Sequence, residues 1–134
     1  MSAAFADTAG ALDEVIDLIG SYFDGLYRSD PELLATVFHP AAVYATATED
    51  PFVRLSMAEY LPIVANRESP ESRGEARTDA IESIEFAGPR TALARVQCSI
   101  GPKHFTDLLS LVRVGTRWQI IAKVFHFDLT DKEI

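Results

Sequence analysis

An aspartate and a histidine on two neighbouring apolar runs near the carboxyl end are the residues whose types and spacing point most directly to chemistry. If two-residue turns join these runs into a sheet, Asp107 and His126 share one face, diagonal to each other. They are then within reach of a hydrogen bond or one bridging water. A carboxylate can orient an imidazole that transfers protons near neutral pH, so the pair predicts acid–base catalysis. The alternative is a buried polar pair that only satisfies itself, because an unpaired carboxylate on an apolar face is costly.

Other polar and aromatic side chains are candidates for binding a small molecule beside this pair. The hydroxyls of Tyr22 and Tyr60 can point into a cavity, although aromatic residues at such spacings are more often core. Arg77 and Asp79 are expected to pair across the pocket rim, and His39 either caps helix carbonyls or lines the pocket mouth. The predicted substrate-binding residues are Tyr22, His39, Tyr60, Arg77, Asp79, Phe105 and Trp118.

Several other chemistries lack the residues they need. The three histidines, His39, His104 and His126, have no short metal-binding spacing, so no metal site is predicted. No glycine-rich phosphate loop and no Gly-x-Ser-x-Gly elbow occurs, and no cofactor is expected. The single cysteine, Cys98, is interpreted as a small buried hydrophobe rather than a nucleophile.

The elements that must position these residues begin with helices. Apolar residues recur every three or four positions over 12–26, which predicts an amphipathic helix of about four turns. Asp30 followed by proline predicts the start of a short second helix that stops at His39 before Pro40. A short strand is expected over 43–46. Ser56 and Glu59 form a capping-box pattern that opens a third helix.

Four long runs follow, and glycine-containing turns separate them. They are expected as strands over 75–86, 91–100, 103–114 and 117–128. Helices first and a meander afterwards predict an α+β fold, with a curved antiparallel sheet packed on three amino-terminal helices.

The register of this meander predicts which side chains face the helices. The expected inner face is almost wholly apolar and includes Val124, whereas Glu82, Arg95 and Lys123 are expected on the outer face. The outer face of the last two strands also receives an apolar strip: Leu108, Val112, Ile121, Phe125 and Phe127. Such a strip predicts a homodimer through the convex face. The alternative is a monomer whose strip is covered by residues 129–134.

Length, composition and charge limit the possible partners. The 134 residues fit one domain, 1–134, and one cysteine allows no internal disulfide. The net charge is −8, and it comes from residues 1–50, which hold nine acidic residues against one base. This distribution argues against nucleic acid and anionic membranes as partners. No signal peptide and no membrane-spanning stretch is found, so a cytoplasmic protein is expected.

Four segments, 22–34, 37–43, 105–111 and 115–125, carry a resemblance to the nuclear-transport-factor-two-like superfamily. Within it the chain is most similar to the putative lumazine-binding group, near the SnoaL-like polyketide cyclases. The resemblance implies a cone-shaped sheet wrapped on three helices, with a pocket in the cone and commonly a homodimer. It also implies relatives that are cofactor-free isomerases, dehydratases and cyclases, and others that only transport or bind.

The sequence thus predicts a small-molecule pocket protein, with a cofactor-free isomerase, dehydratase or cyclase acting on an apolar oxygenated substrate as the first hypothesis. The alternative is a non-catalytic ligand-binding or accessory dimer of the same fold.

Overall fold

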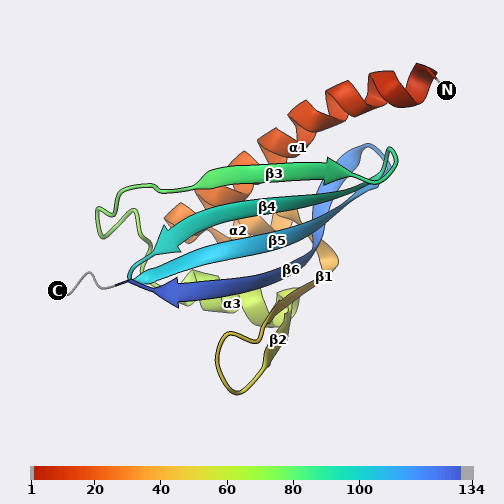
Figure 1. Cartoon of the computed structure of the whole chain (residues 1–134). Coiled ribbons are helices and arrows are strands. Elements are labelled where there is room, and N and C mark those ends of the chain that lie inside the picture. The colour runs from red at the N-terminus through yellow and green to blue at the C-terminus, as the bar shows by residue number, and fades with distance from the viewer. Residues whose placement is uncertain (1, 131–134) are drawn as a thin grey trace.

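Three helices cover one face of the sheet in the computed structural model, which describes residues 2–130 and side chains from residue 10 onward. They are α1 (Ser2–Arg28), α2 (Pro31–Val37) and α3 (Met57–Asn66). Figure 1 shows α1 crossing behind the sheet and extending beyond its edge. No helix in this part of the chain is both long and apolar enough to cross a membrane.

The helix boundaries follow the capping residues that the sequence indicates. The Asp30 side chain accepts a hydrogen bond from the backbone N–H of Leu33, and proline occupies the first turn of α2. Ser56 and Glu59 form the predicted capping box at the start of α3. The first helix is longer than predicted, since it begins at Ser2 rather than near residue 12.

Six strands form one sheet in the order β2-β1-β6-β5-β4-β3. Their bounds are β1 Phe38–Thr46, β2 Val53–Ser56, β3 Ala80–Phe86, β4 Thr91–Ile100, β5 Lys103–Val114 and β6 Arg117–Leu129. The predicted α+β meander is confirmed for β3 to β6. β1 is longer than predicted and pairs parallel to β6, and the short strand β2 was not predicted.

A β-bulge in β6 reverses the faces of the last strand. The predicted register holds where Leu111 pairs with Ile120, but Ser110 then pairs with Ala122, which leaves Ile121 as the extra residue. Because side chains alternate along a strand, one extra residue exchanges the two faces. Lys123 therefore points inward and is 5% exposed, whereas Val124 points outward and is 50% exposed. The predicted face assignment is wrong from residue 122 onward.

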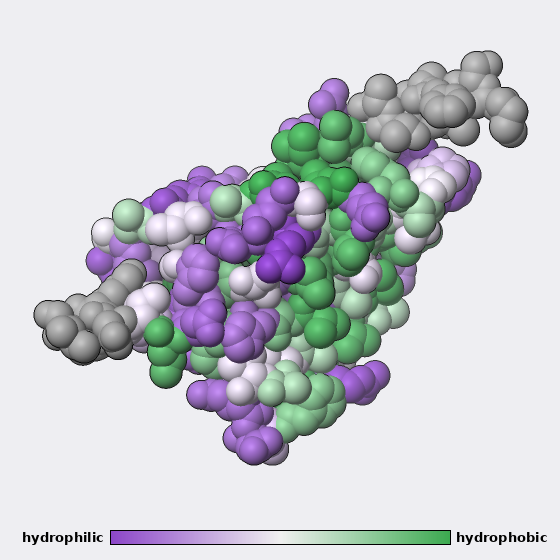
Figure 2. Space-filling view, viewed as in Figure 1, coloured by the Kyte–Doolittle hydropathy of each residue, from purple (hydrophilic) through white to green (hydrophobic). Residues whose placement is uncertain are grey.

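The outer face of the sheet accordingly differs from the predicted one. Arg95 and Glu82 form the expected outer ion pair, with 3.1 Å between Nε and Oε1. Phe125 and Phe127, however, are buried on the inner face, so the predicted apolar strip is wrong at these two positions. Figure 2 shows hydrophilic and hydrophobic residues side by side on the face turned away from the helices.

Candidate functional site

A tyrosine and an aspartate meet at the centre of the inner face. Tyr22 comes from the buried side of α1 and Asp107 from β5, and both are fully buried. The Tyr22 hydroxyl donates a 2.6 Å hydrogen bond to Oδ2 of Asp107. Burial, followed by the nearby charge of Asp107, raises the pKa of Tyr22 well above its ordinary value. The phenol therefore stays protonated and holds one carboxylate oxygen in place.

Lys123 lies in a cage of aromatic rings next to this pair. On β6 it faces Leu109, two residues along β5 from Asp107. Its Nζ lies 5–6 Å from five ring centroids: Phe125 5.1 Å, Tyr22 5.2 Å, Tyr44 5.4 Å, Tyr60 5.8 Å and Phe105 6.0 Å. Ring faces are electronegative, so this cage suits a cation in place of water.

The lysine stays charged in this setting. Burial has the largest single effect and lowers the pKa of Lys123, but the opposing effects of Tyr60, Asp107, Tyr44 and Cys98 together raise it above the ordinary value. At neutral pH the side chain is thus an ammonium ion beside an aspartate.

Two polar atoms of this cluster have no hydrogen-bond partner among the described residues. They are Oδ1 of Asp107 and the hydroxyl oxygen of Tyr60, and both are buried. Buried polar atoms are usually paired, and unpaired ones are common where a ligand or water completes the site. We call Tyr22, Tyr60, Asp107 and Lys123 the buried cluster.

A pocket of about 460 Å³ opens beside the buried cluster. It lies between the segment after α3, the β4–β5 turn and the ends of β1 and β6, at the end of the sheet where Figure 1 shows that turn and the segment together. Its inner wall includes Tyr44, Phe105 and Phe125, which are three of the five rings around Lys123. We call it the mouth pocket; a small organic molecule fits its volume.

The structure does not bring Asp107 and His126 together. His126 follows the bulge and lies on the outer face, where its side chain is 61% exposed. Its Nε2 lies 2.9 Å from Asp128 and its Nδ1 3.2 Å from the Thr48 hydroxyl. The predicted catalytic pair is therefore wrong, and Lys123 takes the diagonal position beside Asp107.

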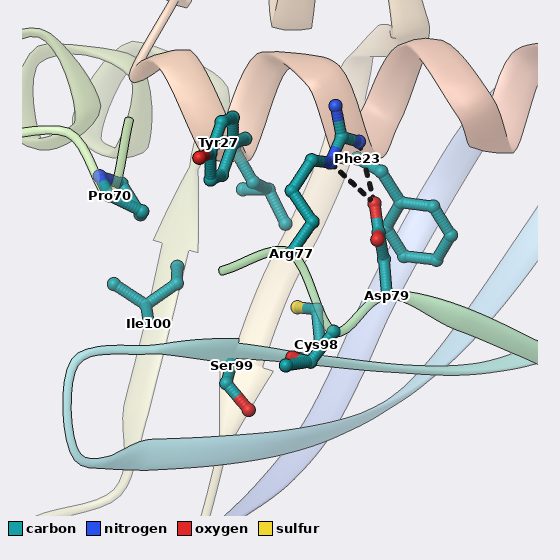
Figure 3. A pocket seen from close by; sticks show the side chains of 10 residues that line it. Phe23, Tyr27, Pro70, Arg77, Asp79, Cys98, Ser99 and Ile100 are labelled. Carbon is teal, nitrogen blue, oxygen red and sulfur yellow. Dashed lines mark hydrogen bonds and ion pairs between the residues drawn. The ribbon is translucent and has the colours of Figure 1, made fainter. Parts of the chain in front are cut away.

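Arg77 and Asp79 form the predicted pair, at another edge of the sheet. Arg77 Nη2 lies 2.6 Å from Asp79, and Nη1 lies 2.9 Å from Asp24 on α1. Figure 3 shows this pair beside Phe23 and near the Cys98 sulfur. These residues line a cavity of about 20 Å³. That volume holds a water molecule rather than a substrate.

Cys98 behaves as the small hydrophobe that its sequence context predicts. Burial, with the charge of Asp107 second, raises the pKa of its thiol to about 12, so almost no nucleophilic thiolate forms at neutral pH. Within residues 2–130, no group of three or more histidine, cysteine, aspartate or glutamate side chains is arranged to hold a metal ion.

The remaining predicted residues divide between the site and the scaffold. Tyr22 and Tyr60 belong to the buried cluster, and Phe105 lines the mouth pocket. His39 lies in β1, where its Nδ1 accepts a hydrogen bond from the backbone N–H of Ala41. Trp118 packs on Phe86 away from the cluster.

Sequence reasoning missed Lys123. The signal that pointed to it was the pair of phenylalanines at 125 and 127, which share a strand face with Lys123 and would be costly on a solvated face. With Phe125 and Phe127 placed inside, Lys123 must also point inward.

Comparisons with known proteins give relatives of similar length. An aldolase, FrzH from Cladobotryum sp, is 25% identical over 122 residues, which is 89% of this chain and 93% of that protein. An NTF-2 like protein of unknown function from Silicibacter pomeroyi superposes with a TM-score of 0.81 and 20% identity, over 90% of this chain and 98% of the other. A ketosteroid isomerase-like protein from Erwinia carotovora atroseptica superposes with a TM-score of 0.68 and 13% identity, over 87% of this chain and 95% of the other.

A family model covers most of the chain. It is described as "Putative lumazine-binding" and matches residues 11–126, which span α1 to β6 and include the whole buried cluster. The fold of the chain is the one seen in the NTF2-like proteins. The family match shows that the chain belongs to the putative lumazine-binding family.

Proposed function

We propose that the protein is a cofactor-free lyase or isomerase, which removes a proton next to a carbonyl group of an apolar substrate. The reaction class is that of an aldol addition, an aldol cyclisation or a double-bond shift, all of which begin with removal of this proton and pass through an enolate. Similarity to the aldolase FrzH, which is 25% identical, supports the carbonyl chemistry.

The observation that carries this proposal is the pair of unpartnered atoms beside a buried cation. Asp107 Oδ1 and the Tyr60 hydroxyl are buried without partners, next to the Lys123 ammonium. A base, a hydrogen-bond donor and a positive charge are the three groups that enolate formation needs.

Each group has a definite role in this scheme. Asp107 Oδ1 takes the proton from the carbon next to the carbonyl, while Tyr22 holds Oδ2 and so orients the carboxylate. The carbonyl oxygen accepts a hydrogen bond from Tyr60 as its negative charge develops. Lys123 stabilises that charge electrostatically; because its pKa is raised, it acts as an ammonium ion and not as an amine nucleophile.

A second candidate function is binding without catalysis. Tyr44, Phe105 and Phe125 line the mouth pocket, and Lys123 and Asp107 do not, so a ligand in the pocket meets rings first. Contact with the buried cluster requires these rings to move. A ligand that stays in front of them is bound and not converted.

Exchange of carbonyl α-protons for deuterium tests the proposal without knowledge of the substrate. Apolar ketones and 1,3-diketones, for example 2-tetralone, are incubated with the protein in D₂O and followed by NMR. We expect catalysed exchange that falls by about 100-fold or more in Asp107→Asn and Lys123→Met.

The matched control is His126→Gln, on the outer face, which should exchange as the wild type does. Folding of every variant is checked by its NMR spectrum. Compounds that bind without any catalysed exchange would favour the second candidate. Trapping of a lysine adduct with borohydride would contradict the electrostatic role of Lys123.

A further inference from the structure

Arg67 enters the mouth pocket from the end of α3. It is the residue that ends the helix: its backbone N–H bonds to the Val64 carbonyl, and its backbone is extended, with φ −99° and ψ 149°. The chain therefore leaves the helix axis at this residue. Its side chain becomes part of the pocket lining together with Tyr44 and Phe105.

The guanidinium of Arg67 has no partner for one of its edges among the described residues. Nε and Nη2 are both buried, and neither makes a hydrogen bond. The two arginines that follow in the same segment are paired: Arg73 with Glu75 at 2.9 Å, and Arg77 with Asp24 and Asp79. A buried charged donor without an acceptor is costly, so this edge is suited to an acceptor supplied from outside.

The free edge has the shape that binds a carboxylate. Nε and Nη2 are the two donors that form parallel hydrogen bonds to the two oxygens of a carboxylate. Arg77 uses the same two atoms on Asp79, at 3.2 and 2.6 Å. Arg67 thus carries, on a residue of the pocket lining and without a partner, the pair of donors that Arg77 uses on Asp79.

The charge around the pocket favours an anion as well. The chain carries a net charge of −8, yet the mouth pocket is lined by Arg67, Arg73 and Lys103 against one acidic residue, Glu68. Glu68 makes no ion pair with Arg67 within 4.0 Å in the described structure.

The rest of the pocket wall is aromatic, which defines the other half of the ligand. Tyr44, Phe105, Phe125 and Phe127 line the pocket, and the first three also surround Lys123. An anion held by Arg67 would place its apolar body against these rings, and so against the wall of the buried cluster.

We infer that Arg67 is an anion-binding residue of the mouth pocket, and that the compound taken there is a carboxylate with an apolar or aromatic body. Only one part of this inference rests on the proposed function, namely that the reacting carbonyl of the bound compound points towards the buried cluster. The binding step itself rests on Arg67 and the pocket alone.

Paired probes that differ only in charge provide the test. Naphthalene-2-carboxylate and its neutral amide, 2-naphthamide, are titrated into the wild-type protein by isothermal calorimetry at neutral pH. We expect the carboxylate to bind about tenfold or more tightly than the amide, since a charge-assisted hydrogen bond contributes that much. Arg67→Gln should abolish the difference, and Arg67→Lys should keep part of it.

Arg95→Gln is the matched control, because it removes the same charge outside the mouth pocket, on the outer face of the sheet, where Arg95 is paired with Glu82. It should change the preference for the carboxylate by less than about threefold. Equal binding of the two probes, no binding of either at millimolar concentration, or a preference that survives Arg67→Gln would overturn the inference. Asp107→Asn should keep the carboxylate preference, so failure of α-proton exchange and failure of the anion site are distinguishable.

Discussion

At the scale of single residues, the inner face of the sheet contains a lysine beside Asp107 where the sequence indicated a histidine. An imidazole can be buried in its uncharged form, whereas an ammonium ion needs a compensating environment. Lys123 has one: Asp107 nearby and five rings within about 6 Å. The cluster is therefore held together by Tyr22, whose hydroxyl fixes the carboxylate that compensates the lysine.

Tyr22→Phe tests how much this hydrogen bond contributes. It leaves both oxygens of buried Asp107 without a partner, so we expect the free energy of unfolding to fall by about 2 kcal/mol or more. Tyr27→Phe is the control, because its hydroxyl donates to the Glu75 backbone carbonyl in a half-buried place. That variant should lose about 1 kcal/mol in urea unfolding. Equal losses of unfolding free energy in the two variants would show that the Tyr22–Asp107 hydrogen bond contributes no more than an ordinary half-buried one.

The raised pKa of the Cys98 thiol predicts that the folded protein loses stability at alkaline pH. Its pKa is about 12 in the folded protein against an ordinary 9.0, so the unfolded chain releases the proton first. The contribution of this thiol to the free energy of unfolding is complete below about pH 9. It is lost as the pH rises towards about 12, by at most about 1.4 kcal/mol per pH unit.

Urea midpoints measured from neutral pH to about pH 11 check this expectation. In Cys98→Ala the decline should begin about one pH unit higher, where the raised pKa of Tyr22 becomes the next contribution of the same sign. An identical pH profile in the variant and the wild type would count against the buried thiol as the cause.

At the scale of elements, the crossing of α1 over α2 sets the position of Tyr22. Gly25 lies at this crossing, and a Cβ there would come within 2.6 Å of Leu34 Cδ2. Leu34 is fully buried and has little room to move. Gly20, one and a half turns earlier, has nothing within 4 Å of the same position.

The two glycines therefore predict opposite effects of alanine. Gly25→Ala should destabilise the protein by about 1–3 kcal/mol through overpacking. Gly20→Ala should stabilise it by about 0.5–1 kcal/mol, since alanine is the better helix former. Thermal unfolding of both variants gives the comparison. Stabilisation by both would mean that the two helices separate without cost.

The helices and strands could be predicted more completely from the sequence than the residues of the site. Hydrophobic spacing and caps identified the three helices and the meander, because burial imposes a period on every element. The site depended on register, and the bulge at Ile121 changed the register by one residue. The signal for this change, the phenylalanines at 125 and 127, also fitted an apolar strip on the outer face. The extra residue is on β6, so Asp107 on β5 keeps its predicted face. Lys123 and His126 follow the bulge on β6 and therefore exchange theirs.

At the scale of the whole molecule, the corrected register changes which residues the predicted homodimer would use. Leu108 and Val124 pair across β5 and β6 on the outer face and are 40% and 50% exposed. Leu93 on β4 is 40% exposed nearby, whereas Phe125 is buried. Exposed apolar residues on neighbouring strands favour an interface, so we still predict a homodimer through this face.

Charge substitutions on the two faces of β6 test this assembly in full. Val124→Glu and Leu108→Glu should each convert a dimer to a folded monomer in sedimentation equilibrium, because a carboxylate would be buried in an apolar contact. Phe125→Glu should instead unfold the protein, since residue 125 packs against Phe105 and Tyr44 inside the cone. Leu129→Glu, at the 65% exposed end of β6, is the control and should leave the assembly unchanged. A wild-type monomer at tens of micromolar would contradict the dimer. A dimer that tolerates both Val124→Glu and Leu108→Glu would place its interface away from the sheet.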